Sequence, residues 1–225
     1  MNNSEIFSCA QMIDYVNKIG ILPLLNLGIP GWSADDAVSD DCRYAVLPDG
    51  SWEWPLWQWK GEIIKSSGCA YGKFINKKAV FISREWWPHF CNWRRSIAPA
   101  LEEDSIEYMI LETLHDGGSM ITRDLRRECG FTGKGMRGKF DSYVSRLQME
   151  CRIVTEDFVF PRDRNDKPYG WGWSLLSTPE QLFGKEACHT ECKPQQSLEL
   201  LTAHLKKILP STDDKTIERL LGKKK

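Results

Sequence analysis

The chain has 225 residues, 41% hydrophobic and 27% charged, a composition typical of a globular protein large enough to bury a substantial core. Its 30 Lys+Arg against 31 Asp+Glu give a formal net charge of -1, which excludes a histone-like polycation and an acidic tail protein. The longest apolar run, residues 19–29, is interrupted by Gly, Pro and Asn and is too short to span a membrane, and the N-terminus lacks secretory features. We therefore expect a cytoplasmic protein with eight reduced cysteines and no membrane partner.

Tryptophan is the compositional anomaly of the sequence. Ten are present, of which four lie within residues 52–59 and three within residues 86–93. Each supplies a large apolar surface and one N–H donor, so a dense group builds either the core of a small domain or a flat-sided pocket for a planar ligand. Both interpretations are open at this stage.

The first hundred residues predict short, mixed elements. Apolar residues at helical spacing over 8–19, with Ser8 as N-cap, predict an amphipathic helix, and Ser33 followed by Asp36 predicts the start of a brief one. Residues 42–83 favour a small β-sheet that includes the tryptophan-rich segment and residues 62–64. Ser83 then predicts the N-cap of a helix to about residue 95, and an acidic, Pro-containing stretch at 98–104 marks a boundary.

The second half predicts three helices followed by a hairpin. Ser105 begins a helix to about 115, Thr122 begins one that ends near Gly130, and a third covers 139–150. Two apolar segments then flank a polar hairpin tip at 162–170. This order is that of a winged helix-turn-helix.

These elements predict an α+β protein in three parts. A small tryptophan-rich α/β domain (1–99) is followed by a winged helix-turn-helix (100–185). A linker and short C-terminal helices (186–225) form an appendage.

Positive charge is concentrated on the predicted second and third helices. Residues 119–147 carry seven Lys/Arg against three Asp/Glu, whereas residues 1–60 carry three against eight. A phosphate-facing surface for duplex DNA follows from this asymmetry, and the alternative is a solvated face used for protein contacts. The residues expected at the DNA are Arg123, Arg126, Arg127, Lys134, Arg137 and Lys139, with Arg162, Arg164 and Lys167 on the hairpin tip.

Several motifs resemble those of a known family. In chain order they are WPLWQWKG (54–61), FISREW (81–86), SRLQMECRIV (145–154), KPYGWG (167–172) and TPE (178–180). Together they resemble bacterial proteins classed as AlkZ-related, relatives of the YcaQ-type winged-helix DNA glycosylases, over roughly residues 10–185. For those glycosylases the resemblance implies tandem winged helices around a DNA channel and excision of alkylated or crosslinked bases.

The sequence departs from the glycosylases at their catalytic motif. Those enzymes carry a Gln-x-Gln or Gln-x-Asp pair that positions water, and this chain has neither. The nearest string begins at Gln148, on the predicted third helix, where we expect Gln148 at the surface.

Candidate catalytic groups are the polar residues interleaved with tryptophans. Hydrolysis of a glycosidic bond needs a carboxylate or amide that holds water, or a desolvated lysine nucleophile. The candidates are Gln58, Lys60 and Glu85, with Trp57, Trp59 and Trp86 as rings that could stack an extruded base. The alternative is that Lys60 extends to solvent from a strand end and Glu85 stabilises the first turn of a helix.

No cofactor or metal is expected. Cys188-His189-x-x-Cys192 has no second paired cluster to complete four zinc ligands. The glycines at 133, 135 and 138 have dinucleotide-loop spacing but follow no strand, which predicts a basic turn before a helix. Besides a DNA-binding protein and a glycosylase, a ligand-responsive regulator remains an alternative.

Overall fold

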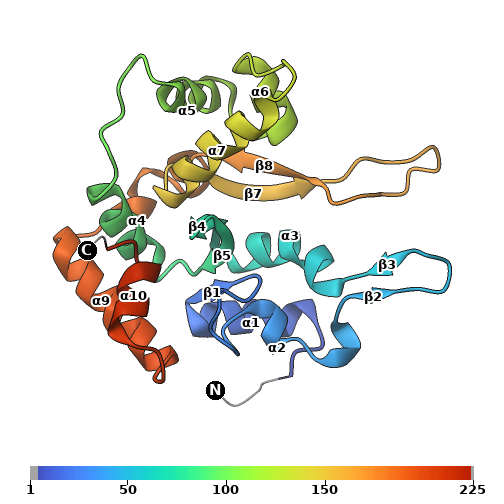
Figure 1. Cartoon of the computed structure of the whole chain (residues 1–225), viewed down its shortest axis with the longest axis horizontal. Coiled ribbons are helices and arrows are strands. Elements are labelled where there is room, and N and C mark those ends of the chain that lie inside the picture. Colours follow the sequence, from blue (N-terminus) through green and yellow to red (C-terminus); the bar gives the residue numbers. More distant parts are fainter. Residues whose placement is uncertain (1–4, 224–225) are drawn as a thin grey trace.

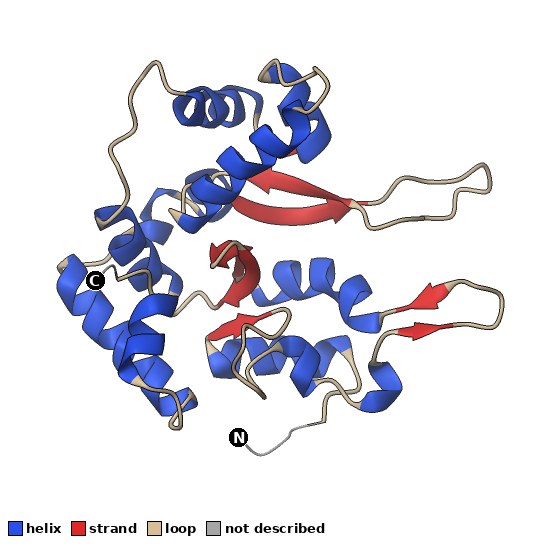
Figure 2. Cartoon of the chain, in the orientation of Figure 1, coloured by secondary structure: helices blue, strands red, loops and turns tan. Residues whose placement is uncertain are grey.

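The computed structural model describes residues 5–223 as a mixed α/β structure with small antiparallel sheets, in agreement with the predicted class (Figures 1 and 2). One sheet has the strand order β1-β5-β4, a second is the pair β2-β3, and a third has the order β6-β8-β7.

The N-terminal elements surround the first sheet. Their bounds are α1 (Cys9–Ile19), β1 (Ile21–Pro23), α2 (Ala34–Ala37), η1 (Asp40–Cys42), β2 (Ala45–Val46), β3 (Trp52–Glu53), β4 (Ala70–Ile75) and β5 (Lys78–Ile82). The predicted caps are confirmed, because the hydroxyls of Ser8 and Ser33 accept hydrogen bonds from the backbone N–H groups of Gln11 and Asp36. The β4–β5 hairpin also lies where the sequence predicts it.

The tryptophan-rich segment is largely a helix, which corrects the strand prediction. α3 (Pro55–Ser67) begins with Pro at its first position and ends at Gly68, whose backbone is left-handed (φ 64°). Leu56, Lys60, Ile63 and Ile64 are its buried residues, at i, i+4, i+7 and i+8. The dense aromatic residues favour strands by propensity, but this helical stripe determines the structure.

The next helix, α4 (Trp87–Ser96), starts later than predicted. Its N-cap is Trp86, and the Ser83 side chain makes no cap bond. Instead, the backbone carbonyl of Ser83 accepts hydrogen bonds from the N–H groups of Trp86 and Trp87, so residues 84–86 form a turn.

The second half builds its own sheet and core, which we call the three-helix region (α5 through β8). Its bounds are α5 (Ile106–Gly117), β6 (Met120–Ile121), α6 (Thr122–Glu128), α7 (Met136–Met149), β7 (Val154–Val159) and β8 (Trp173–Ser177). Ser105 caps α5 as predicted. α7 begins three residues early because Gly135 adopts a left-handed backbone (φ 79°) as its N-cap. Ile110, Leu114, Leu125, Phe140 and Leu147 are fully buried between the elements.

The C-terminal helices are not an appendage. α8 (Pro179–Phe183) and η2 (Lys185–Cys188) lead into α9 (Pro194–Ile208) and α10 (Asp214–Leu220). Leu201 and Leu205 are completely buried in the same core as α1, α3 and the first sheet, and α9 packs along α4 (Figure 1). The indole N–H of Trp93 donates to the carbonyl of Leu221 at 2.8 Å. Residues 187–223 therefore complete the core of the N-terminal half, which we call the main core.

Within residues 5–223, no helix combines the length and the hydrophobicity needed to cross a membrane.

Candidate nucleic-acid interface

A cationic pocket lies where the three-helix region meets β4. It has a volume of about 330 Å³ and is bounded by α6, the start of α7, β8 and the strand β4. Four cations and one carboxylate face it, a local balance of +3, together with small polar groups. The lining residues are Lys73, Thr122, Arg123, Arg126, Arg137, Asp141, Gly172, Trp173 and Ser174. This charge suits an anion.

Packing positions two of the pocket's guanidinium groups. The Arg123 guanidinium carbon lies 4.7 Å from the ring centre of Trp173, and Thr122 beside it donates its hydroxyl to the carbonyl of Ser174 at 3.0 Å. Arg137 stands in the first turn of α7, where its Nε lies 3.8 Å from the carboxylate of Asp141. Both contacts leave N–H donors that can bind a further oxygen atom.

Within residues 5–223, Arg126 is the pocket cation whose side chain has no polar partner. Its side chain is half-buried, and in the described part of the chain it makes no hydrogen bond and no ion pair. Partial desolvation makes an unpaired charge costly and makes an incoming anion favourable. The pocket therefore favours the binding of an anion.

The fourth cation, Lys73, comes from the other half and was missed by the sequence analysis. It occupies the single exposed position of β4, and its Nζ lies 3.4 Å from the hydroxyl of Ser145 on α7. In the sequence, Lys73 is the one charged residue of the predicted strand 70–75, and this pattern could have identified it.

Gln148 joins the same two elements, which corrects its predicted surface position. Its side chain is 3% exposed, accepts a hydrogen bond from the backbone N–H of Lys73 at 3.2 Å and donates to Thr155 at 3.3 Å. The surface prediction is wrong because α7 packs its second face on β4.

The remaining predicted DNA-contacting residues lie outside the pocket. Arg127 pairs with Asp124 and Glu128, both at 3.2 Å, while Lys134 and Lys139 are exposed around the start of α7. On the hairpin tip, Arg162 is held by Asp166 at 3.0 Å, and Arg164 and Lys167 are exposed. The sequence-predicted cations thus form a pocket group, a group around the start of α7 and a hairpin-tip group, and Arg127 lies apart from these in the last turn of α6.

Lys60 occupies a separate apolar site. It is 0% exposed on α3, and its Nζ lies 2.9 Å from the ring centre of Trp57 and 3.7 Å from that of Phe158 on β7. Its Nζ has no hydrogen-bond partner within residues 5–223. Burial lowers the pKa of Lys60 from 10.5 to about 6, so the amine is largely neutral at pH 7. The alternative of a solvent-directed amine at a strand end is wrong.

Stacked rings cover this site and form a tryptophan bridge, comprising Tyr44, Trp52, Trp54, Trp57 and Trp171. Trp52 stacks on Trp171 at 4.6 Å and Trp54 on Trp57 at 5.2 Å. The Trp57 indole N–H donates to the carbonyl of Trp171 at 3.3 Å. Since Trp54 and Trp57 also pack against the main core, these contacts favour the core interpretation of the cluster.

The other candidate catalytic and stacking residues are dispersed. Gln58 is exposed on α3, and Glu85 is exposed in the turn before α4. Trp59 packs against the main core, whereas the Trp86 ring stacks on His204 at 3.9 Å. Among the described residues, no hydrogen bond or ring contact joins Gln58, Lys60 and Glu85.

A family model described as AlkZ related matches residues 6–222. The chain belongs to the AlkZ-related family. No curated protein and no solved structure matches it. Membership indicates a DNA-repair-related, glycosylase-like protein, and the match includes the C-terminal helices that complete the main core.

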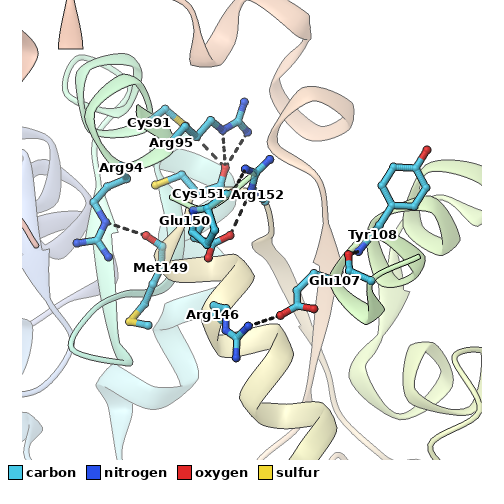
Figure 3. A network of polar contacts seen from close by, with 12 residues as sticks. Cys91, Arg94, Arg95, Glu107, Tyr108, Arg146, Met149, Glu150, Cys151 and Arg152 are labelled. Carbon is cyan, nitrogen blue, oxygen red and sulfur yellow. Dashed lines mark hydrogen bonds and ion pairs between the residues drawn. The ribbon is translucent and has the colours of Figure 1, made fainter. Parts of the chain in front are cut away.

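In this AlkZ-related chain, a polar network holds the end of α7 against α4 (Figure 3). Arg95 donates to the carbonyl of Cys151 through Nε at 3.2 Å and Nη2 at 2.7 Å, and its Nη1 lies 2.6 Å from Glu180. Arg94 donates to the carbonyl of Met149 at 2.8 Å. Burial raises the pKa of Glu150, which pairs with Arg152 at 3.3 Å. The side chain of Gln148 therefore forms buried hydrogen bonds, and that of Glu150 forms an ion pair, and both contacts stabilise the fold.

No group of three or more metal-ligating side chains is found in the part of the chain that the structure describes, and all eight cysteines are free.

Proposed function

We propose that this AlkZ-related protein binds duplex DNA, with residues 100–185 acting as a winged helix-turn-helix. The element order α5-β6-α6-α7-β7-β8 and the strand order β6-β8-β7 support this assignment. The polar segment between β7 and β8 serves as the wing, and α7 as the helix presented to the duplex.

The observation that carries the proposal is the cationic pocket with the unpaired Arg126. A DNA phosphate would satisfy Arg126, and the free donors of Arg123 and Arg137 would complete its coordination. Such contacts fix the position and register of the protein on the backbone and carry no base sequence by themselves. Residues 1–60, which we call the acidic front, carry eight Asp/Glu against three Lys/Arg, one of which is the buried Lys60. This charge disfavours an orientation in which the acidic front faces the DNA.

The test is fluorescence anisotropy of a labelled duplex, titrated over a series of salt concentrations. Arg126→Ala, Arg137→Ala and Lys73→Ala should each weaken binding and reduce the slope of log K against log[salt] by about one. The matched control is Arg43→Ala, which removes an exposed cation paired with Asp40 in the acidic front. Equal slopes for all four variants and the unmodified protein would refute the proposed surface.

Base excision is the second candidate function, and the buried neutral amine of Lys60 favours it. A neutral lysine amine is a nucleophile: it would attack C1′ of the damaged nucleotide, the glycosidic bond would break, and the base would leave with the proton that the amine loses. Opening of the sugar ring then gives an imine, the same species that the amine forms, with loss of water, from the aldehyde of an abasic site. The aromatic rings around Lys60 would stack a displaced base, provided that the tryptophan bridge opens.

Reductive trapping distinguishes this second function from simple binding. Borohydride added to the protein with an abasic duplex should yield a covalent complex that is lost in Lys60→Met and retained in Gln58→Ala and Glu85→Ala. A complex that survives in Lys60→Met, or no complex at all, would remove Lys60 as a nucleophile.

A further inference from the structure

Two cysteines that are far apart in the sequence face each other beside α4. The Cys91 thiol lies 3.2 Å from the sulfur of Cys188 and 3.8 Å from the carbonyl of Cys151. Cys91 is 0% exposed on α4, whereas Cys188 is half-buried at the end of η2. Cys188 is therefore the more accessible of the two cysteines, and Cys91 is enclosed.

The surroundings favour the thiolate form of Cys188. The hydrogen bond donated by Cys91 and the positive charge of Arg95 lower the pKa of the Cys188 thiol. Burial raises the pKa of the Cys91 thiol, which therefore keeps its proton and acts as the donor. A partly accessible cysteine with a lowered pKa next to a second cysteine is the arrangement of a redox-sensitive pair.

We propose that Cys91 and Cys188 form an oxidation site, which a small peroxide converts into an intramolecular disulfide. This assignment gives a role to the first cysteine of the Cys188-His189-x-x-Cys192 segment, and it is independent of DNA binding.

The reaction proceeds in two balanced steps. The Cys188 thiolate attacks one oxygen of hydrogen peroxide, the O–O bond breaks, and the departing hydroxide takes up a proton to become water, which leaves a sulfenic acid. The Cys91 sulfur then attacks the Cys188 sulfur, so that the S–S bond forms and the S–O bond breaks. The second hydroxide leaves as water with the Cys91 proton. Two thiols lose two electrons, and one peroxide becomes two waters.

The disulfide would join the two segments of the chain that flank the three-helix region, α4 before it and η2 after it. The chain enters that region after α4 and leaves it through α8 and η2 (Figure 1). A bond between residues 91 and 188 would therefore close a covalent loop around the whole region and restrain its unfolded state.

The test treats the reduced full-length protein with hydrogen peroxide, alkylates the remaining thiols and maps the peptides by mass spectrometry. We expect a mass loss of two hydrogens and one crosslinked peptide pair that contains Cys91 and Cys188. Cys188→Ser should abolish the crosslink, and Cys91→Ser should stop the reaction at a sulfenic acid on Cys188, which a cyclic 1,3-dione reagent captures.

The matched control is Cys192→Ser, because Cys192 is half-buried in the same segment and should not affect the crosslink. Circular dichroism checks the folding of Cys91→Ser, and Cys91→Ala replaces it if the serine is not tolerated. A bond between Cys188 and Cys192, a disulfide between two chains, or Cys188 that remains fully alkylatable after peroxide would overturn the proposal.

Discussion

The indole rings of Trp52 and Trp171 stack at 4.6 Å with an interplanar angle of 15°, and they link two hairpins from opposite halves of the chain. Trp52 lies on the β2–β3 hairpin, and Trp171 lies in the segment that leads into β8. In Figure 1 both hairpins extend toward the same side of the molecule. This contact and the Gln148 bonds are two of the places where the three-helix region meets the N-terminal half of the chain.

Removal of the stack should destabilise the protein modestly. We expect Trp52→Ala and Trp171→Ala to be coupled by about 0.5–1.5 kcal/mol, the range for an aromatic pair beyond its buried area. A double-mutant cycle from urea unfolding measures this coupling. Additive effects of the two substitutions would show that the rings contribute independently.

Lys60→Met should increase stability and remove a pH dependence. The pKa of Lys60 falls from 10.5 to about 6 in the folded state, so between these pH values the unfolded chain binds one more proton. The free energy of unfolding therefore rises with pH in this window, by up to about 1.4 kcal/mol per unit. Below pH 6 the full cost of burying the amine is present, and above 10.5 it disappears.

Urea unfolding at several pH values between 6 and 10 checks this prediction. The difference in stability between Lys60→Met and the unmodified protein should shrink as the pH rises, because methionine has no proton to bind. Parallel pH profiles for the two proteins would mean that Lys60 keeps an ordinary pKa and is solvated.

Asp141→Asn should strengthen DNA binding. Asp141 is the one carboxylate that faces the cationic pocket, and it holds Arg137. Its neutralisation raises the local balance from +3 to +4 and frees the Arg137 guanidinium, for an expected gain of roughly threefold to tenfold in affinity at low salt. Thermal stability should hardly change, since an exposed i,i+4 pair contributes about 0.3–0.5 kcal/mol. Weaker binding would indicate that Asp141 orients Arg137 productively.

Gln148→Leu should destabilise the contact between α7 and β4. The substitution leaves the Lys73 backbone N–H and the Thr155 hydroxyl without the amide partner, at an expected cost of about 1–3 kcal/mol. Chemical denaturation measures this cost. Gln181→Leu, which removes the hydrogen bonds from α8 to the carbonyls of Leu114 and His115 on α5, is a comparison at a different contact. An unchanged free energy of unfolding in Gln148→Leu would mean that the interface between α7 and β4 tolerates the unpaired groups.

Local signals identified much of this fold from the sequence. Ser8, Ser33 and Ser105 marked true helix starts, because an N-cap depends on a side chain and a backbone group a few residues away. The helix–hairpin order of residues 105–177 was likewise visible in apolar spacing and turn residues. Ser83 shows the limit of this approach, since the same residue type there caps no helix.

Features that depend on contacts between distant segments were not predictable in this way. Lys73 and Gln148 meet only because α7 packs on β4, and the sequence places them 75 residues apart. The sequence predicts that α9 is an amphipathic helix, but it does not show that α9 packs against α4. Lys60 was identified as a candidate from its tryptophan neighbours, but its burial depends on Phe158, which belongs to the other half.

Hydrogen–deuterium exchange, measured with and without a saturating duplex at low salt, tests the central claim most directly. The account predicts slower exchange on DNA binding in residues 122–141 and 172–174, which line or border the cationic pocket, and no change in residues 34–53 of the acidic front. Protection confined to residues outside the pocket, or no protection under conditions where the duplex is bound, would contradict the account.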